Sequence, residues 1–202
     1  MSPKDEDRRQ QILDAAQKVF AAKGFEGASI KDLAKAAKIS PGLLYWYFKD
    51  KTDLLVSLLT ERIETAIGQL PKSVSFDAPP EEFMPQFARF YIGTFEQPMN
   101  TALFKVVITN TPSFPTAIRR VQSGVINRVL GTLQDYFQRQ IKLGRMRRCD
   151  TEMVTRTFMG SVMAFLLLRH ILQDERGREI SVEAFVTGVT DVILHGILSA
   201  DK

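Results

Sequence analysis

Hydrophobic residues recur with a helical period along most of the chain. Near the N-terminus, Ile12, Ala15, Ala16, Val19 and Phe20 follow the i, i+3, i+4 spacing that places side chains on one face of an α-helix. Similar stripes continue to the C-terminal region, and we find no convincing strand and no internal repeat. The pattern predicts an all-α protein of about nine helices.

Start and stop signals predict three helices within residues 1–52. Gly24 predicts the end of the first helix, because a residue without Cβ readily adopts a left-handed conformation. Ser29, followed three residues later by an aspartate, predicts a capping box at the start of the second. Ser40 as N-cap and Pro41 as first helical residue predict the start of the third. These residues are therefore expected to form a three-helix head.

Residues 53–202 are predicted to form a larger helical body. Pro71 to Pro80 contains three prolines and no helical pattern, which indicates a linker. The longer helices are expected at about 51–70, 81–97 (bent or restarted at Pro85), 99–109, 115–143, 150–173 and 181–198.

The third predicted helix, PGLLYWYF, carries an unusual number of large apolar side chains. Helical spacing predicts an inward face of Pro41, Leu44, Tyr45 and Phe48, and an outward face of Gly42, Leu43, Trp46 and Tyr47. An exposed face with Leu, Trp and Tyr is unusual on a surface that contacts only water. Two short helices joined by a tight turn, the second with an exposed face, describe a helix-turn-helix.

A helix-turn-helix would place this third helix in the major groove of DNA. Gly42 permits close approach, Leu43 suits a thymine methyl group, and Lys49 and Lys51 are placed to contact phosphates. The start of the helix near Lys51 would add backbone N–H donors. The net charge of +4 is concentrated at residues 1–52, where ten Lys/Arg face seven Asp/Glu. Short apolar helices are more often core elements, so the pattern alone leaves both interpretations open.

The segment SIKDLAKAAKISPGLLYWYFKDKTDL resembles the N-terminal signature of TetR-family transcriptional regulators, and the resemblance covers roughly residues 8–55. The residues that match the family's pattern, at the family's spacing, are a Ser cap, then Leu-Ala, then Ala-Ala-x-Ile-Ser, and finally Leu-Tyr-x-Tyr-Phe-x-x-Lys. The resemblance implies that Tyr45, Tyr47 and Lys51 contact phosphates and that residues around Ser40 to Leu43, with Trp46, read bases. The DNA-binding residues predicted in all are Ser29, Lys38, Ser40, Pro41, Gly42, Leu43, Tyr45, Trp46, Tyr47, Lys49 and Lys51.

Lys38 departs from the family pattern, which usually has glycine in this turn. If Lys38 is left-handed, a residue with Cβ costs roughly 1–2 kcal/mol there. The lysine would also add a cation near the DNA backbone.

The same resemblance implies a helical domain for effector binding and dimerisation at residues 53–202. We expect a homodimer through the last two helices that reads an inverted-repeat operator in double-stranded DNA. The expected effector is a small hydrophobic molecule that releases a repressor from this operator. Aromatic and Met residues at helical spacing more often form core than pocket, and the effector-pocket candidates among them are Phe87, Tyr91, Phe104, Phe137, Phe158 and Met163.

No enzyme motif is present in the sequence. It lacks a Gly-rich phosphate loop, GxSxG, HExxH and cysteine pairs, so we expect no catalytic residue, cofactor or metal. The polar N-terminus, the single Cys149 and an apolar run of only Phe158 to Leu168 predict a cytoplasmic protein with no membrane partner. A helical enzyme or a lipid carrier is the alternative class, and it predicts ligand binding without specific DNA affinity.

A basic cluster lies near the end of the predicted 115–143 helix. Positive charge is favourable at the C-terminal end of any helix, which favours a structural role over a second DNA contact. Its members are Arg139, Lys142, Arg145, Arg147 and Arg148.

Overall fold

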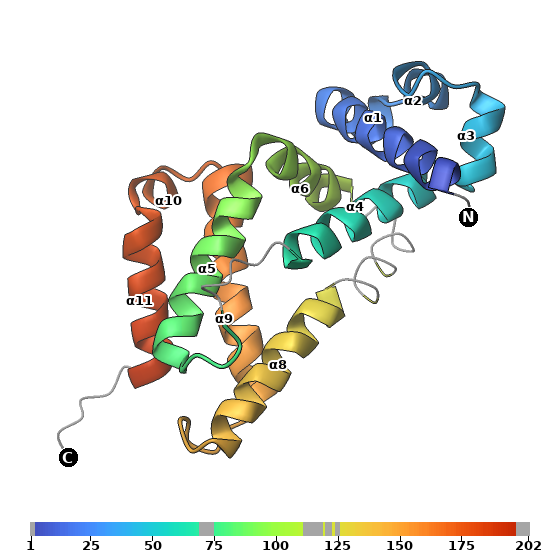
Figure 1. Ribbon diagram of the computed structural model, residues 1–202. Helices are drawn as coiled ribbons and strands as arrows, with labels where there is room; N and C mark the ends of the chain where they lie inside the picture. The colour runs from blue at the N-terminus through green and yellow to red at the C-terminus, as the bar shows by residue number, and fades with distance from the viewer. Residues whose placement is uncertain (1–2, 69–74, 111–118, 120–122, 124–125, 197–202) are drawn as a thin grey trace, which may run out of the picture. The chain divides into compact units, whose positions relative to one another are not determined.

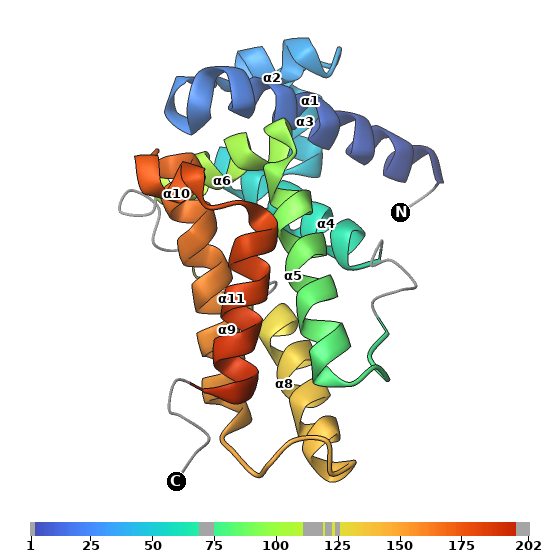
Figure 2. The same ribbon diagram turned by 90° about the vertical axis from the view of Figure 1, so that its left-hand side faces the viewer.

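The computed structural model describes residues 3–68, 75–110, 119, 123 and 126–196, and these form helices without a strand (Figure 1, Figure 2). The all-α prediction is confirmed. In chain order the elements are α1 (Pro3–Gly27), α2 (Ile30–Ala36), α3 (Pro41–Tyr47), α4 (Lys51–Gly68), α5 (Pro80–Glu96), α6 (Pro98–Asn110), α8 (Asn127–Lys142), α9 (Thr151–Leu166), the π-helix η2 (Leu167–Ile171), α10 (Glu175–Glu179) and α11 (Val182–His195).

The chain divides into two compact units. The first contains Met1–Gly68 and Gln97–Ile126, and the second contains Gln69–Glu96 and Asn127–Lys202. Contacts therefore group α4 and α6 with the three N-terminal helices. A division by contacts is not a division by function, so the expected boundary at residues 52/53 stays a prediction.

The first unit is built around α1, which packs against α2, α4 and α6. The predicted apolar stripe of α1 faces this core: Ile12, Ala16 and Phe20 are fully buried, and Val19 packs at its edge. Leu103 of α6 is buried in the same core. The core residues contributed by the other helices are Leu33 and Ala34 of α2, Leu44 of α3, Phe48 after it, and Leu54, Leu55, Val56, Leu58 and Leu59 of α4.

The turn between α2 and α3 closes with the backbone pattern of a Schellman motif. The Lys38 N–H donates to the Lys35 carbonyl at 3.1 Å, and the Ile39 N–H donates to the Ala34 carbonyl at 3.0 Å. Lys38 has a φ of 55°, so it is left-handed where the family usually has glycine. Gly24 also has non-helical backbone angles, with a φ of 69° and a ψ of 175°. The first helical segment therefore ends there as predicted, and a second short helical segment continues across this kink to Gly27.

In the second unit α9 packs against α5, α8 and α11, and α5, α9 and α11 run side by side in both views (Figure 1, Figure 2). Asp150 and Ser181 cap α9 and α11 as predicted. A two-bond ion pair joins Arg89 of α5 to Glu183 of α11, with Nε–Oε1 at 2.9 Å and Nη2–Oε2 at 2.9 Å. This pairing raises the pKa of Arg89 and lowers that of Glu183.

Some boundaries differ from the sequence-based expectation. Helix α9 becomes the π-helix η2 at Leu167, and α10 was not predicted. Pro85 lies inside α5, as anticipated. Residues 71–74 of the expected linker, most of residues 115–126 of the expected long helix and the end of the last helix lie outside the described residues.

One stretch of the described residues, Thr151–Ile171, is long and apolar enough to cross a membrane. It includes more than the Phe158–Leu168 run considered above. A single such helix is weak evidence, because core helices pass the same test. Its packing against three helices of the unit is the behaviour of a core helix.

The left-handed Lys38 predicts that Lys38→Gly raises the free energy of unfolding. Removing the Cβ relieves about 1–2 kcal/mol of strain, and the greater freedom of glycine in the unfolded chain offsets about 0.5–1 kcal/mol. Chemical denaturation should therefore show a gain of up to about 1.5 kcal/mol in the free energy of unfolding. Lys38→Ala is the control, because it removes the charge and keeps the Cβ. A glycine variant no more stable than the alanine variant would contradict the prediction.

Candidate nucleic-acid interface

Helix α3 is held by two buried anchors. Leu44 is fully buried within the helix, and Phe48, which ends it, is buried beside it. The start of the helix is fixed by Ser40, whose hydroxyl accepts a hydrogen bond from the Leu43 N–H at 3.2 Å, with Pro41 in the first turn. A helix of only seven residues is unstable alone, so these anchors and caps set its orientation.

The opposite side of α3 exposes three large side chains. The exposed fractions are 37% for Leu43, 53% for Tyr45 and 65% for Trp46. Ser40, Pro41 and Gly42 are also exposed, as is Lys49 just beyond the helix. Most of the residues predicted to read DNA are therefore at the surface. We call Ser40, Pro41, Gly42, Leu43, Tyr45 and Trp46 the α3 face.

Three residues of α3 are placed differently from the prediction. Pro41 and Tyr45 were assigned to the inward face but are exposed, and Tyr47 was assigned to the outward face but is half-buried against the core. For the two tyrosines the reason is the helical angle of about 100° per residue. Tyr47 lies about 60° from Leu44 around the helix, whereas Tyr45 lies about 100° away on the other side.

Tyr47 is enclosed by neighbouring groups. The Trp46 ring meets its ring edge-on, with centroids 4.6 Å apart. Partial desolvation raises the pKa of Tyr47, the nearby Asp5 carboxylate raises it further, and Arg8 lowers it. Because Tyr47 is half-buried and Tyr45 is exposed, the structure gives less support to Tyr47 as a phosphate contact than to Tyr45.

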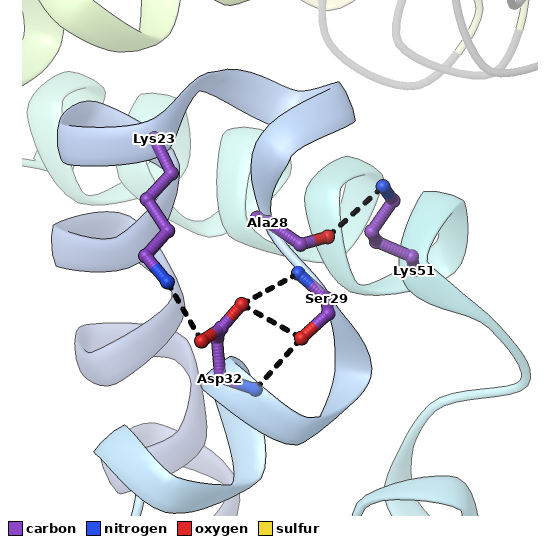
Figure 3. Close-up of polar contacts among 5 residues, drawn as sticks. All are labelled: Lys23, Ala28, Ser29, Asp32 and Lys51. Carbon is purple, nitrogen blue, oxygen red and sulfur yellow. Dashed lines mark hydrogen bonds and ion pairs between the residues drawn. The ribbon is translucent and has the colours of Figure 1, made fainter.

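Lys51 makes contacts within the first unit rather than facing solvent. Its ammonium donates hydrogen bonds to the carbonyl oxygens of Phe25, at 2.7 Å, and Ala28, at 3.0 Å. It also lies 4.4 Å from the centroid of the Phe25 ring, a cation–π arrangement. The bond to Ala28 is drawn in Figure 3. Lys51 therefore ties α4 to the segment between α1 and α2, a role that the sequence did not predict.

The start of α4 is already occupied by carboxylates. The Asp53 N–H donates to Oδ1 of Asp50 at 2.7 Å, and the Lys49 N–H donates to Oδ2 of Asp53 at 3.1 Å. Some of the backbone N–H groups expected to bind a phosphate at the start of α4 therefore already have partners, and the negative charges of Asp50 and Asp53 lie beside them. The sequence contained a signal for this, since Asp-x-x-Asp has the spacing of a capping pair.

Ser29 belongs to a compact polar cluster at the start of α2 (Figure 3). Its hydroxyl accepts from the Asp32 N–H at 3.1 Å, and its own backbone N–H donates to the Asp32 carboxylate at 3.0 Å, which confirms the capping box. The Ser29 hydroxyl also donates to the Asp32 carboxylate at 2.7 Å. Lys23 reaches the other carboxylate oxygen at 2.7 Å. Bonds from Lys23 and Ser29 hold the pKa of Asp32 well below its usual range. Ser29 is exposed, but its hydroxyl hydrogen is already engaged.

Aromatic side chains of α5, α8 and α9 form a continuous cluster in the second unit. Phe83 stacks on Tyr136 with centroids 3.8 Å apart, Phe87 lies 5.5 Å from Phe83, and Phe158 lies 6.2 Å from Phe87. We call these four residues, with Phe137 beside Tyr136, the aromatic cluster. The aromatic cluster contains three of the six predicted pocket residues, Phe87, Phe137 and Phe158. Its other two members, Phe83 and Tyr136, were not among those six.

The other predicted pocket residues are placed less centrally. The Tyr91 ring lies 6.1 Å from Phe87, and its hydroxyl lies 3.6 Å from the Met163 sulfur. Burial of this hydroxyl raises the pKa of Tyr91. Phe104 lies on α6 and belongs to the first unit, so it is not part of the cluster that the second unit forms by itself.

Other candidate chemistry is limited within the described part of the chain. It contains no group of three or more His, Cys, Asp or Glu placed to hold a metal ion. In the basic cluster, Arg139 pairs with the Asp77 carboxylate, and Arg145 donates to the Asp77 carbonyl at 2.7 Å. These contacts support the structural role expected for the end of α8.

The head and its exposed third helix define a helix-turn-helix protein with a second helical unit. Two family models match the chain: bacterial regulatory proteins of the tetR family at residues 12–58, and the C-terminal domain of AefR-like transcriptional repressors at residues 82–195. The second alone covers more than half of the chain. The chain therefore belongs to the TetR family of bacterial transcription regulators.

Individual relatives agree with this assignment. The HTH-type transcriptional regulator HbdR of Aromatoleum sp. (strain CIB) is 39% identical over 69 residues, which are 34% of this chain and 30% of the relative. The match thus spans about a third of that protein. Among solved structures, one from Mesorhizobium loti MAFF303099 assigned to the TetR family has a TM-score of 0.81 at 19% identity, covering 96% of this chain and 98% of the other.

A further solved structure includes a ligand. FadR from Bacillus subtilis in complex with stearoyl-CoA has a TM-score of 0.71 at 19% identity, with 94% of this chain and 99% of the other covered. At this identity both solved structures show a shared fold.

The contacts of Lys51 predict that Lys51→Met destabilises the first unit. Two carbonyl oxygens lose a charged donor, which costs about 1–2 kcal/mol at a half-buried site. Lys49→Met is the matched control, because Lys49 is exposed; its effect should stay within about 0.5 kcal/mol. Urea unfolding of both variants measures the difference.

The Lys49→Met and Lys51→Met variants also show whether Lys51 positions the fold or contacts a phosphate. Lys49→Met should reduce the salt dependence of DNA affinity by about one unit of slope, as expected for one lost phosphate contact. Lys51→Met should weaken binding without changing that slope. A lower slope and an unchanged stability for Lys51→Met would instead establish the phosphate contact first expected.

The lowered pKa of Asp32 predicts a loss of stability in acid. Asp32 stabilises the folded state above its unfolded pKa of about 4, and this contribution is lost as the pH falls towards its lower folded pKa. Asp32→Asn should therefore be less stable than wild type at pH 7, and the difference in their free energies of unfolding should become smaller below pH 4. Urea unfolding between pH 7 and pH 2.5 measures this, with exposed Glu26→Gln as control. A gap that stays constant with pH would rule out the role assigned to the Asp32 carboxylate.

Proposed function

We propose that this protein is a cytoplasmic, dimeric repressor that binds an inverted-repeat operator and leaves it when a hydrophobic small molecule binds. The observation that supports this most strongly is the exposed α3 face on a helix anchored by Leu44 and Phe48. Family membership supports the regulator class. Repression, the operator and the effector are the parts that experiment has to decide.

The α3 face has the chemistry to read base edges in a major groove. Leu43 offers an apolar contact for a thymine methyl group, and Trp46 offers a large apolar ring. A Cβ added to Gly42 would meet only the Ser40 hydroxyl, at 4.0 Å, so neither packing nor a positive φ requires glycine there. Close approach to DNA gives a reason for it.

The phosphate contacts would come from around this face. Tyr45 is an exposed member of the α3 face, Lys49 is exposed beside it, and Lys38 adds a cation at the turn that precedes α3. These groups would fix the position of the helix, while the α3 face supplies the sequence dependence. Ser29, Tyr47 and Lys51 remain proposed contacts, but the structure already gives each of them an intramolecular partner.

The homodimer would form through α9 and α11. On α9 the exposed residues include Gly160 and Ala164, and on α11 they include Gly188 and Val192. Leu168, on the adjoining η2, is also exposed. Small residues permit close helix approach, and the exposed Leu168 and Val192 would gain by burial. A two-fold pair of such chains matches the symmetry of an inverted repeat.

The effector would bind at the aromatic cluster of the second unit. Large rings with Met163 nearby suit a flat or extended apolar molecule. The binding of stearoyl-CoA by a protein of the same fold, FadR from Bacillus subtilis, supports a hydrophobic effector. Ligand binding would favour an arrangement of the dimer in which the two α3 helices no longer match successive major grooves.

Selection from a randomised duplex library tests the proposed operator. The purified protein is incubated with the library at two salt concentrations, and the bound DNA is sequenced. We expect an inverted repeat at both, with half-sites about one helical turn apart or a multiple of it. Trp46→Ala should relax the preference at positions within each half-site. Binding that is lost at the higher salt and leaves no motif would show only phosphate attraction and contradict the proposal.

Ultracentrifugation tests the dimer. Gly188→Arg places a charged side chain on α11, where an added Cβ meets nothing within 4 Å of its own chain, so the fold should be retained. We expect wild type to sediment as a dimer at micromolar concentration and the variant as a monomer. Gly131→Arg, at an equally open glycine on α8, is the control and should remain dimeric. A monomeric wild type would contradict the proposal, as would a dimeric Gly188→Arg.

A further inference from the structure

Among the buried polar atoms of the described residues that have no hydrogen-bond partner, one lies on α8 and one on α9, two of the helices that contribute to the aromatic cluster. They are the Gln140 Nε2 and the Thr155 Oγ1, on side chains that are 0% and 2% exposed. Leaving such groups unpaired in a protein interior is unfavourable, because they have lost their hydrogen bonds to water and gained none in return. An occupant that can hydrogen-bond to both would remove this cost.

Arg145 fixes which end of the Gln140 amide is unpaired. Its guanidinium donates to the Gln140 Oε1 at 3.4 Å, and a guanidinium can only donate. The amide oxygen must therefore face Arg145, which leaves the NH₂ group towards the interior. Gln140 thus presents a donor.

Thr155 differs from another buried threonine of the same unit. The hydroxyl of Thr190 on α11, 5% exposed, donates to the carbonyl of Val186 one turn earlier, at 2.7 Å. A buried helical threonine usually satisfies itself in this way. Thr155 makes no such bond, so its hydroxyl is left for another acceptor or donor.

Helix periodicity places both groups next to the aromatic cluster. Gln140 lies one turn after Tyr136 on α8, and Thr155 lies three residues before Phe158 on α9. Helices α8 and α9 pack together, and Phe83 and Phe87 connect Tyr136 to Phe158 through ring contacts. A ligand that lay along these rings would have its polar end within reach of both donors.

We propose that Gln140 and Thr155 bind an uncharged carbonyl group, as in an amide, ester or ketone, at one end of an otherwise apolar effector. This rests on the effector site proposed above and specifies its ligand. Two donors call for an acceptor oxygen. A carboxylate would also accept, but burying its charge needs a buried partner cation. Gln140 and Thr155 are uncharged, and Arg145 is exposed and contacts the oxygen end of the Gln140 amide rather than its NH₂ group.

The first test requires no ligand. Thr155→Val replaces an unpaired hydroxyl by a methyl group of the same size, so the melting temperature should rise by about 2–4 °C. Thr190→Val removes a satisfied hydroxyl and should lower it. If Thr155→Val lowers the melting temperature as much as Thr190→Val, the Thr155 hydroxyl has a partner, such as a bound water, and the inference is overturned.

The second test uses three probes with one apolar body: biphenyl, biphenyl-4-carboxamide and biphenyl-4-carboxylate. We expect the carboxamide to bind wild type at least fivefold more tightly than either of the others, measured by calorimetry. Thr155→Val and Gln140→Leu should remove this advantage and leave the affinity for biphenyl unchanged. Equal binding of all three, or tightest binding of the carboxylate, would overturn the carbonyl assignment while retaining an apolar effector site. If none binds, the carbonyl inference and the effector proposal both fail, whereas operator selection still decides the DNA-binding proposal independently.

Discussion

The burial of Leu44 and Phe48 is the constraint on which the proposed DNA-binding surface depends. Helix α3 has only seven residues, too few for a stable helix in water, so the core of the first unit determines its position. Once these two side chains are buried, Leu43 and Trp46 must lie towards solvent. The exposure of large apolar side chains, which would otherwise be unfavourable, then follows from how the helix is anchored.

Much of the polar chemistry around α3 maintains the head itself. Lys51 joins α4 to the segment before α2, and Asp32 joins the start of α2 to Lys23. Asp50 and Asp53 cap α4. A lysine is suited to phosphate binding, but it can instead stabilise the fold through intramolecular contacts. For Lys51, the two short hydrogen bonds to carbonyl oxygens indicate this structural role. The surface that remains for the proposed DNA contacts is smaller and more apolar than the full set of predicted contact residues.

The fold class and the capped starts of α2, α3, α9 and α11 could be predicted from sequence because they depend on local spacing. The positions of Tyr45 and Tyr47 were harder to predict, because helical spacing over eight residues does not show which side chains are buried as anchors. The partners of Lys51 are more than twenty residues away in the chain, and no local pattern reports them. The unpaired state of Thr155 depends likewise on what lies around it in three dimensions.

Hydrogen exchange of the protein with and without the selected operator duplex would test the central claim most directly. The account predicts that DNA slows exchange of backbone amides mainly at Ser40–Tyr47 and in the turn before it, with residues 127–148 unchanged. It also predicts that the Trp46→Ala variant loses most of this protection. Protection centred on the basic cluster at the end of α8, with the α3 amides unaffected, would contradict the assignment of α3 as the DNA-reading helix.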